Sequence, residues 1–434
     1  MKRRLLPILM TLVLVCALPI WAAFVTSGDV TNPLVSTAGA TSSEESAVDK
    51  LKLAISRGVD AQLTEDIEIT QTLYVERSMT IDLNGHVLKM TGDGSVLRVE
   101  EGPHPVTLTI TDSRPQNPHT EPYVGLPAGG VITGGKGTDA GGSVRSVGGA
   151  VFLENGTTLE LEGGTLTGNS SHGSVFINGA TFVMTGGTIT GETVGVHNNV
   201  GTFTMTGGRI TGCSDRGVYV YNGNMTMSGT AYIGENPNAR REDIYVYESD
   251  HKHTDLSVTG GTIAGKVRIV FLESLGPTKE DLKAAANSVV KEQGVFDGHI
   301  KVEKGTSGTC VDYNSVNFID EVAKTRTLKL VLQPNAVEEP ETPATVNGRE
   351  FMYWTKEGVS EAWDFSTEIK GPLTLYAVRT PASSSGGYYY YPTTDTKADD
   401  AKGSPKTADP GVALYAALSL LSLTGLTYTA RKKF

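Results

Sequence analysis

The sequence predicts an all-β protein folded as a parallel β-helix, in which short strands wind into stacked coils. The ten-residue phrase FVMTGGTITG at residues 182–191 returns as FTMTGGRITG at residues 203–212. A repeat of roughly 20–50 residues is typical of stacked architectures, because each repeat must bury its apolar face against a neighbour. The abundance of glycine (51 of 434 residues) indicates many tight turns. The related segments begin at Leu159, Phe182, Phe203, Met225 and Leu256, with spacings of 23, 21, 22 and 31 residues.

Each repeat is predicted to contain two or three short strands. Its start has apolar residues two apart, which is the pattern of a strand with one buried face. These pairs are Leu159/Leu161, Phe182/Met184, Phe203/Met205, Met225/Met227 and Leu256/Val258. A bend at glycine follows, and then a third apolar residue: Leu166, Ile189, Ile210, Ile233 or Ile263.

Another strand is predicted between these phrases. Its inward pairs are Val151/Leu153, Val175/Ile177, Val196/Asn198, Val218/Val220 and Ile244/Val246. Asn198 is the one polar residue in this set, which predicts either an asparagine ladder or a local bulge.

Both ends of the solenoid are expected to be covered, because an open coil is an edge that aggregates. An amphipathic helix over residues 46–56 is expected to cover the first coil with Val48, Leu51, Leu53 and Ile55. Residues 113–148 are rich in Pro and Gly and predict a long loop leaving one corner. The solenoid with its N-terminal helical cap is therefore assigned to residues 44–270.

The rhythm of the repeats stops after Ile269. Residues 278–294 predict a helix with Thr278 as its N-cap, and residues 327–334 predict a last strand. Residues 271–335 are therefore assigned to a C-terminal cap or a small α+β domain.

The first residues have the form of a secretory signal peptide, assigned to residues 1–23. A positive region at residues 2–4 precedes an apolar stretch over residues 5–18 and small residues at Ala22 and Ala23. The cleavage position stays open, because Trp21 breaks the simplest small-x-small pattern. Cys16 raises a lipoprotein alternative, which Val15 immediately before it disfavours.

The C-terminal residues 404–434 have three parts. A short motif precedes an apolar stretch over residues 412–428, whose length is at the lower end for a membrane span, and a basic tail. This layout resembles the LPxTG sorting signal of Gram-positive surface proteins, with Ser in place of Leu and Ala in place of Gly. The resemblance implies that a sortase cuts after Thr407 and joins its carbonyl to cell-wall peptidoglycan; a plain membrane anchor is the alternative. The motif consists of Ser404, Pro405, Lys406, Thr407 and Ala408.

Two further resemblances concern the middle of the chain. The TGGTITG phrases and IDLNGHVL at residues 81–88 resemble the pectin-lyase-like superfamily, and especially repeat proteins on the surface of gut Gram-positive bacteria. That resemblance implies a right-handed parallel β-helix and says little about activity. Residues 346–379 resemble an internalin-type B repeat, a small β module of surface-protein stalks, on Phe351, Trp354, WDFST and LTLYA. Residues 380–403 are typical of a flexible linker.

Composition and motifs exclude several functions. The formal net charge of −11 disfavours nucleic-acid binding. His251-x-His253 has no evident third ligand, so neither a metal site nor a cofactor is predicted. Whether Cys213 and Cys310 form a disulfide is left open.

No catalytic residue is predicted either. The lyases and hydrolases of the superfamily use clustered Asp residues with basic partners, and their fuller motifs do not appear in this sequence. Asp215-Arg216 and the charged residues 240–243 are interpreted as solvated turns, with a charged patch as the alternative.

A row of aromatic residues is predicted on the outer face of the second strand. Stacking would place successive outward residues in one column, about 4.8 Å apart. Such rings can bind sugars, and the alternative is that they only stabilise the stack or lie under a covering segment. The candidate ligand-binding residues are Phe152, Phe176, His197, Tyr219, Tyr221, Tyr245 and Tyr247.

These observations predict a secreted protein anchored to the Gram-positive cell wall. Its expected partners are sortase, peptidoglycan, the membrane before sorting, and a glycan or host-surface ligand. The leading hypothesis is an adhesin-like protein that binds glycans without catalysis. The alternatives are a polysaccharide lyase or glycoside hydrolase of this fold, and a structural spacer.

Overall fold

The computed structural model describes residues 45–139, 146–235, 242–251, 255–289, 295–305 and 309–382. The predicted signal peptide, the sorting signal, the stretch over residues 412–428 and the linker beyond residue 382 lie outside these ranges. Within the described ranges, no helix is long and apolar enough to cross a membrane. The chain divides into two compact units, residues 1–343 with 352–378 and residues 344–351 with 379–434.

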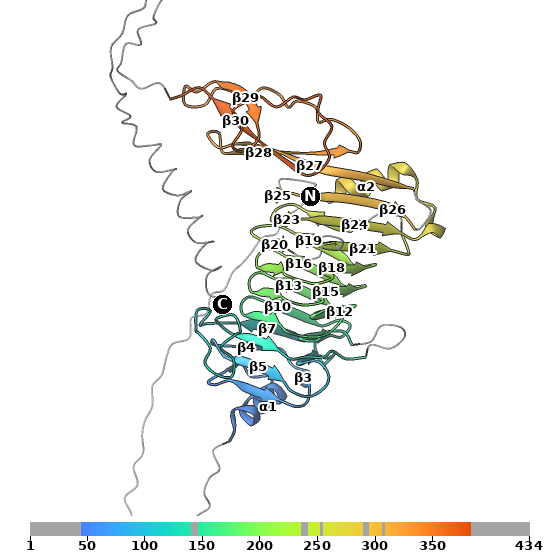
Figure 1. Ribbon diagram of the computed structural model, residues 1–434. Helices are drawn as coiled ribbons and strands as arrows, with labels where there is room; N and C mark the ends of the chain where they lie inside the picture. The colour runs from blue at the N-terminus through green and yellow to red at the C-terminus, as the bar shows by residue number, and fades with distance from the viewer. Residues whose placement is uncertain are drawn as a thin grey trace, which may run out of the picture. The chain divides into compact units, whose positions relative to one another are not determined.

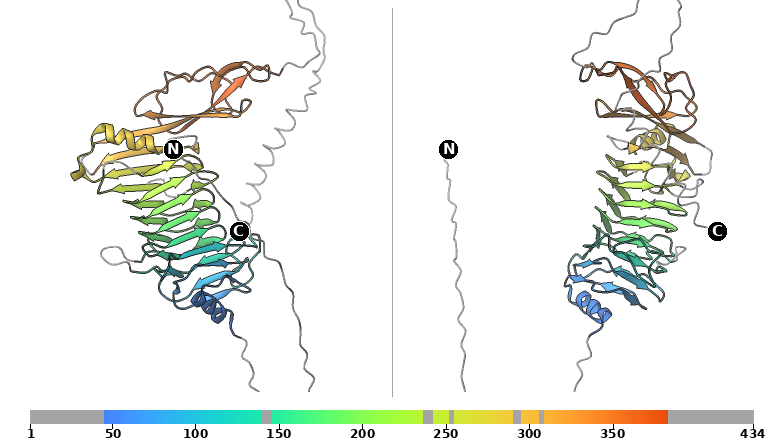
Figure 2. Two further views of the ribbon diagram at one scale, coloured as in Figure 1. Left: turned by 180° about the vertical axis from the view of Figure 1, so that it is seen from behind. Right: turned by 60° about the vertical axis from the view of Figure 1, so that its left-hand side comes forward.

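The first unit is a parallel β-helix, as predicted, and its strands form three stacked sheets (Figures 1 and 2). Sheet A contains β1 (Ala61–Gln62), β4 (Met79–Asp82), β7 (Thr107–Thr111), β10 (Thr158–Leu161), β13 (Thr181–Met184), β16 (Thr202–Met205), β19 (Asn224–Met227) and β22 (Leu256–Val258). Sheet B contains β2 (Ile67–Ile69), β5 (Val87–Met90), β8 (Val131–Thr133), β11 (Thr165–Thr167), β14 (Thr188–Thr190), β17 (Arg209–Thr211), β20 (Tyr232–Gly234), β23 (Thr262–Ala264) and β25 (Val295–Phe296).

Sheet C is the longest of the three. It contains β3 (Leu73–Val75), β6 (Leu97–Val99), β9 (Val151–Leu153), β12 (Val175–Asn178), β15 (Val194–Asn199), β18 (Arg216–Tyr221), β21 (Ile244–Glu248), β24 (Lys266–Phe271), β26 (His299–Lys304), β27 (Cys310–Asp320), β30 (Leu373–Arg379) and β29 (Phe351–Thr355). One further strand, β28 (Thr325–Leu332), pairs with β27.

The repeated phrases lie directly over one another in successive coils. Phe182 pairs in register with Phe203, and their buried rings stack with centroids 4.9 Å apart and planes 14° apart. The glycine pair is needed for the bend: a Cβ on Gly207 would lie 2.1 Å from the backbone oxygen of Thr185, and Gly208 has a φ of 78°. The predicted inward residues of all three strands are buried in one continuous core.

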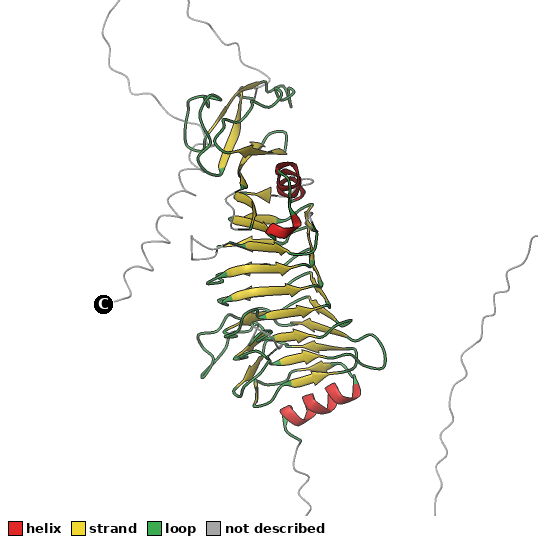
Figure 3. Ribbon diagram, turned by 90° about the vertical axis from the view of Figure 1, so that its right-hand side faces the viewer, coloured by secondary structure: helices red, strands yellow, loops and turns green. Residues whose placement is uncertain are grey.

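A helix covers the first coil, as the sequence predicted (Figure 3). This helix, α1 (Ala47–Arg57), begins after Ser46, whose side chain accepts a hydrogen bond from the backbone N–H of Asp49. Leu51 and Ile55 are buried in the core, whereas the predicted partners Val48 and Leu53 are only half-buried. Two apolar side chains one turn apart are therefore enough to close this end.

The parallel winding continues past the predicted boundary at residue 270. Strands β24 and β26 pair in parallel with Val267 opposite Ile300, and β25 pairs with β23. The regular repeat spacing is lost in the sequence after residue 269. The reason is that the 3-10 helix η1 (Glu273–Leu275) and helix α2 (Lys279–Ser288) are inserted between β24 and β25. Helix α2 begins at the predicted cap, with reciprocal bonds between Thr278 and Asp281. Beyond Lys304 the strands β27 and β28 run antiparallel.

Residues of the predicted B-repeat-like module extend the last sheet. Strand β30 pairs in parallel with β27, with Val316 opposite Leu373, and the ring of Trp354 packs edge-on against Phe318. In the second unit, the side chain of Arg379 donates to the backbone oxygen of Arg349, and Arg349 donates to that of Thr380.

The single loop predicted over residues 113–148 is wrong in one respect. Strand β8 (Val131–Thr133) returns to sheet B in the middle of it, because Val131 and Ile132 fill the buried positions of a coil. One loop results over residues 112–130, and a second connection leads from residue 134 back to sheet C. Val147, in the described part of that connection, packs on the outer face of sheet C.

Asn198 lies at an inward position and forms neither a ladder nor a bulge. It is fully buried, and its amide donates to the backbone oxygens of Gly201 and Asn224 at 3.1 and 2.9 Å. Its side-chain oxygen accepts a 2.9 Å bond from the backbone N–H of Gly201. This side chain therefore supplies the acceptor for the buried backbone N–H of Gly201 and adds a second donor to the Gly201 oxygen, which also accepts from the backbone N–H of Asn224 at 2.8 Å.

Replacement of Asn198 by Val should destabilise the fold, although Val matches the apolar pattern of the strand. The change removes three hydrogen bonds and leaves the buried backbone N–H of Gly201 without its acceptor, so we expect the free energy of unfolding in urea to fall by about 1–3 kcal/mol. The control is Asn199→Val, whose half-buried side chain bonds to Asn178 and should cost less than about 1 kcal/mol. Equal stability of Asn198→Val and wild type would contradict this explanation.

A second buried polar residue, Glu192, makes stability depend on pH. Its carboxylate accepts hydrogen bonds from Asn169 and Ser174. Burial raises the pKa of Glu192 from 4.5 to about 7 despite these bonds. The folded protein thus keeps a proton that the unfolded chain releases above pH 4.5, so folding stability should fall as the pH rises from 4.5 to about 7.

Glu192→Gln should remove this dependence, because glutamine cannot ionise. As the pH rises from 4.5 to 7.5, the unfolding free energy of the variant minus that of wild type should increase by up to about 3 kcal/mol. Thermal or urea unfolding across this pH range measures the difference. Parallel stability curves for the two proteins would show that Glu192 does not titrate as described.

Candidate functional site

The outer face of sheet C brings the predicted aromatic residues into register. One column, called here the aromatic column, runs through five coils in the order Phe152, Phe176, His197, Tyr219 and Tyr245. Tyr221 and Tyr247 form a second stacked pair two positions along the same strands, with centroids 5.6 Å apart and planes 6° apart. Period-two alternation and the fixed register between coils place all seven side chains on one face.

The prediction that this whole column is exposed is wrong for its first three members. Phe152 and Phe176 are 2% exposed because Val147, from the loop over residues 134–150, packs against both rings. His197 is 4% exposed, and His172 approaches it with 3.2 Å between their Nδ1 atoms. Phe152, Phe176 and His197 therefore stabilise the stack and support two loops, and they offer no surface to a ligand.

The four tyrosines remain half-buried at the surface. The rings of Tyr219 and Tyr245 meet edge to face at 5.4 Å. The guanidinium of Arg216 lies 4.4 Å from the centroid of the Tyr245 ring, and that of Arg268 lies 5.6 Å away. Burial raises the pKa of Tyr219 to about 12 and also raises that of Tyr245, so both hydroxyls stay protonated and can donate hydrogen bonds.

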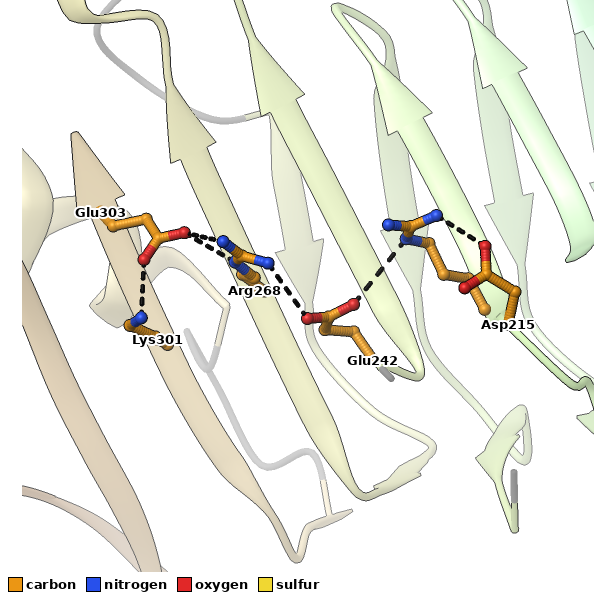
Figure 4. Close-up of polar contacts among 6 residues, drawn as sticks. Asp215, Glu242, Arg268, Lys301 and Glu303 are labelled. Carbon is orange, nitrogen blue, oxygen red and sulfur yellow. Dashed lines mark hydrogen bonds and ion pairs between the residues drawn. The ribbon is translucent and has the colours of Figure 1, made fainter. Parts of the chain in front are cut away.

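Charged side chains of alternating sign run beside these tyrosines (Figure 4). Arg216 contacts Asp215 at 2.7 Å and Glu242 at 3.8 Å. Glu242 also contacts Arg268 at 3.5 Å, and Arg268 bonds in turn to Glu303 through two nitrogens. Lys301 ends the series with a 2.7 Å contact to Glu303. The six residues, Asp215, Arg216, Glu242, Arg268, Glu303 and Lys301, are called the ion row.

The ion row overturns the interpretation of Asp215, Arg216 and Glu242 as solvated turns. The side chains of Arg216 and Glu242 are only 17% and 11% exposed. Ion pairs shielded to this degree hold their geometry better than pairs on open surface, which contribute little. The charged-patch alternative is the one that fits.

The ion row also favours the charged state of Glu303 and Arg268. Burial would raise the pKa of Glu303, but hydrogen bonds from Lys301 and Arg268 outweigh it and hold that pKa below its usual value. Burial likewise works against the charge of Arg268, yet Glu303 raises its pKa. Both groups are therefore charged at neutral pH.

A pocket of about 260 Å³ lies at the end of the ion row. It is lined by Glu242, Lys266, Val267, Arg268, His299 and Lys301. His299 contacts Asp312 on the neighbouring strand β27, so a further carboxylate lies beside this wall. Arg268 belongs both to the lining of this pocket and to the tyrosine face, where it lies near the Tyr245 ring.

Sequence reasoning missed Lys301 and Glu303 because it ended the solenoid near residue 270, and it missed Arg268 because it did not align the strand of residues 266–271 with the strand before it. Arg268 occupies the position after Tyr245 in the aromatic column, and Lys301 follows Arg268. The segment KVRIVF could have been aligned with DIYVYE on its alternating apolar residues. Helix α2 separates this strand from β25 and β26 in the sequence, so the next coil was not recognised as a repeat.

Three other predictions concern ligands and cysteines. Glu248, Asp250 and His251 bring one ligand atom each within 4.8 Å of one another, and Asp255 also lies 3.8 Å from His251. His253, the other half of the His-x-His pattern, lies outside the described residues. Cys213 is buried and Cys310 is exposed, and the two do not form a disulfide with each other.

The fold and this face define the protein as a parallel β-helix with a tyrosine-lined, ion-paired outer surface. Comparison of the chain with protein families, with curated proteins and with solved structures gives no significant match. Function must therefore be argued from the site itself.

Loss of Arg268 should destabilise the protein in a pH-dependent way. Arg268→Gln leaves Glu242 and Glu303 without their shared cation, so we expect the unfolding free energy at pH 7 to fall by about 1–2 kcal/mol. Because the lowered pKa of Glu303 gives stability only while the carboxylate is charged, the deficit should shrink as the pH falls below about 4.5.

The control for this change is Arg209→Gln. Arg209 forms a 3.3 Å pair with Glu235 in which both side chains are about half exposed. Such a pair is worth less than about 1 kcal/mol, with little dependence on pH. Equal effects of the two substitutions would contradict a structural role for the ion row.

Proposed function

We propose that this protein is a binding module displayed on the surface of a Gram-positive cell and that it recognises glycans through the outer face of sheet C. The observation that carries the proposal is the pairing of four half-buried tyrosines with a row of charged planar groups on the same face. Tyrosine rings pack against the C–H faces of sugars, and their hydroxyls add hydrogen bonds. The carboxylates can accept hydrogen bonds from sugar hydroxyl groups, and the guanidinium groups can donate hydrogen bonds to them.

Display on the wall is supported by the sequence alone. The signal peptide, the linker and the variant sorting motif at Ser404–Ala408 are the features that favour it. A sortase and cell-wall peptidoglycan are the partners that this layout implies. A free N-terminal solenoid beyond a flexible linker would then be presented to the medium.

The alternative of a polysaccharide lyase or hydrolase has one observation in its favour. Three carboxylates, those of Asp215, Glu242 and Glu303, lie along neighbouring strands of one face. A glycosidase needs one carboxylic acid with a raised pKa to protonate the leaving group. Each of these three carboxylates is paired with a cation, and the pKa of Glu303 is lowered, which favours binding without cleavage.

The structural-spacer alternative is favoured by the buried half of the aromatic column. Phe152, Phe176 and His197 show that aromatic residues in register can serve the stack alone. Tyr221 and Tyr247 differ from them, because no described loop buries them. Binding by these tyrosines separates the two hypotheses.

A glycan array probed with the full chain tests the proposal. Tyr221→Ala combined with Tyr247→Ala should weaken binding about tenfold or more, because aromatic side chains dominate the energy of such contacts. Tyr74→Ala is the matched control: this tyrosine is 51% exposed on sheet C but stands apart from the ion row, and its loss should leave binding unchanged.

The outcomes separate the three hypotheses. Binding that survives the double substitution would remove the tyrosine face from the proposal, and no binding to any glycan would favour the spacer. Release of new reducing or unsaturated ends from a bound glycan, abolished by Glu242→Gln, would instead establish the enzyme.

A further inference from the structure

We infer that the saccharide bound at this face is an uncharged oligosaccharide. This inference rests on the proposed function and adds the class of ligand. It follows from the charge balance, the geometry and the length of the ion row, which are considered in turn.

The ion row has no surplus charge. Its three cations, Arg216, Arg268 and Lys301, are matched by its three carboxylates, those of Asp215, Glu242 and Glu303. Each cation contacts at least one carboxylate of the row within 3.5 Å. An anionic sugar would therefore have to displace a carboxylate that is already bound, with no unmatched cation of the row to receive it.

The surrounding pocket carries charges of both signs. Lys266 adds a positive charge at its wall, and the buried carboxylate of Asp243 lies close by, where it accepts a hydrogen bond from the backbone N–H of Lys266 at 3.0 Å. The carboxylate of Asp312 contacts His299 at the same wall. With a net charge of −11 for the whole chain, no long-range field draws an anionic polymer towards this face.

Paired charges remain effective partners for neutral hydroxyl groups. Hydrogen bonds to an ionised donor or acceptor are roughly twice as strong as those between neutral groups. A guanidinium held by two carboxylates is fixed in orientation, so less freedom is lost when a hydroxyl bonds to the same atoms. The ion row thus offers oriented hydrogen-bond donors and acceptors, and its balanced charge does not favour a charged ligand over a neutral one.

The length of the row indicates more than one sugar unit. It extends over four successive strands of sheet C, β18, β21, β24 and β26. Three strand spacings of about 4.8 Å give a surface about 14 Å long. The polar groups and the tyrosines run along the stacking direction together, which suits an extended chain lying across the coils.

The test compares matched pairs of immobilised oligosaccharides that share a backbone and differ in one carboxylate or sulfate. The full chain should bind the neutral member at least about tenfold more tightly than the charged one. Binding to the neutral member should change by less than about twofold between low and high salt, because no ion pair forms with the ligand. This series needs no variant and therefore does not depend on how any substitution folds.

A charge-unpairing variant tests the mechanism. Glu303→Gln leaves Arg268 and Lys301 with unmatched positive charge, so binding to the carboxylated and sulfated members should rise about tenfold and become salt-sensitive. The control is Glu235→Gln, which lies on the other side of the coil beside Arg209 and should change neither preference. Unfolding curves of both variants establish that they are folded.

The possible results distinguish this inference from the proposed function. Preference of wild type for the charged members, with binding that falls steeply in salt, would overturn the inference and leave glycan binding standing. An unchanged preference in folded Glu303→Gln would overturn the role of charge pairing. Binding to neither member of any pair would overturn the proposed function, and the inference would fall with it.

Discussion

The pairing of each coil with the one before it, at one fixed register, is the constraint on which the rest of this structure depends. Hydrogen bonds between coils hold Phe182 over Phe203 and Tyr219 over Tyr245 by the same rule. Inside the coil this register produces a continuous apolar core, and outside it produces columns of side chains. The core and the candidate site are thus two faces of a single set of strands.

The same constraint explains how much of the fold could be predicted from the sequence. Period-two pairs such as Leu159/Leu161 and the recurring glycines are local signals, and they located the strands of the coils between residues 151 and 264. The last coil was missed because helix α2 separates β24 from β25, so its strands no longer recur at the expected distance. A pattern that relies on a fixed interval fails at the first long insertion, even where the pairing itself persists.

The candidate site was predictable only in part, for two different reasons. The alignment of Tyr219 with Tyr245 follows from the register, and the sequence contains that information. The burial of Phe152 and Phe176 depends on where Val147 packs, and the loop that carries Val147 has no repeat to guide prediction. Lys301 and Glu303 of the ion row lay beyond the last recognised coil, and the other members look like ordinary surface charges until the strands place them side by side.

Asn198 and Glu192 show a further limit of patterns. Both are polar residues enclosed by the coil, and both are explained by the backbone or side-chain groups that they satisfy at corners. Corners are the places where the regular ladder between coils is interrupted, so unmet backbone groups collect there. A prediction based on apolar patterns treats such residues as exceptions. The buried polar groups around them need these residues as hydrogen-bond partners.

The loops over residues 134–150 and 168–174 have one consequence for how such a surface can change. They cover Phe152, Phe176 and His197 without contributing to the alternating pattern of the strands beneath them. The length of the accessible face is therefore set at the corners, and the kind of residue displayed there is set in the strands. Insertions and deletions at a corner can shorten or lengthen the footprint coil by coil while the core stays the same, which makes the extent of recognition and the stability of the scaffold separately adjustable.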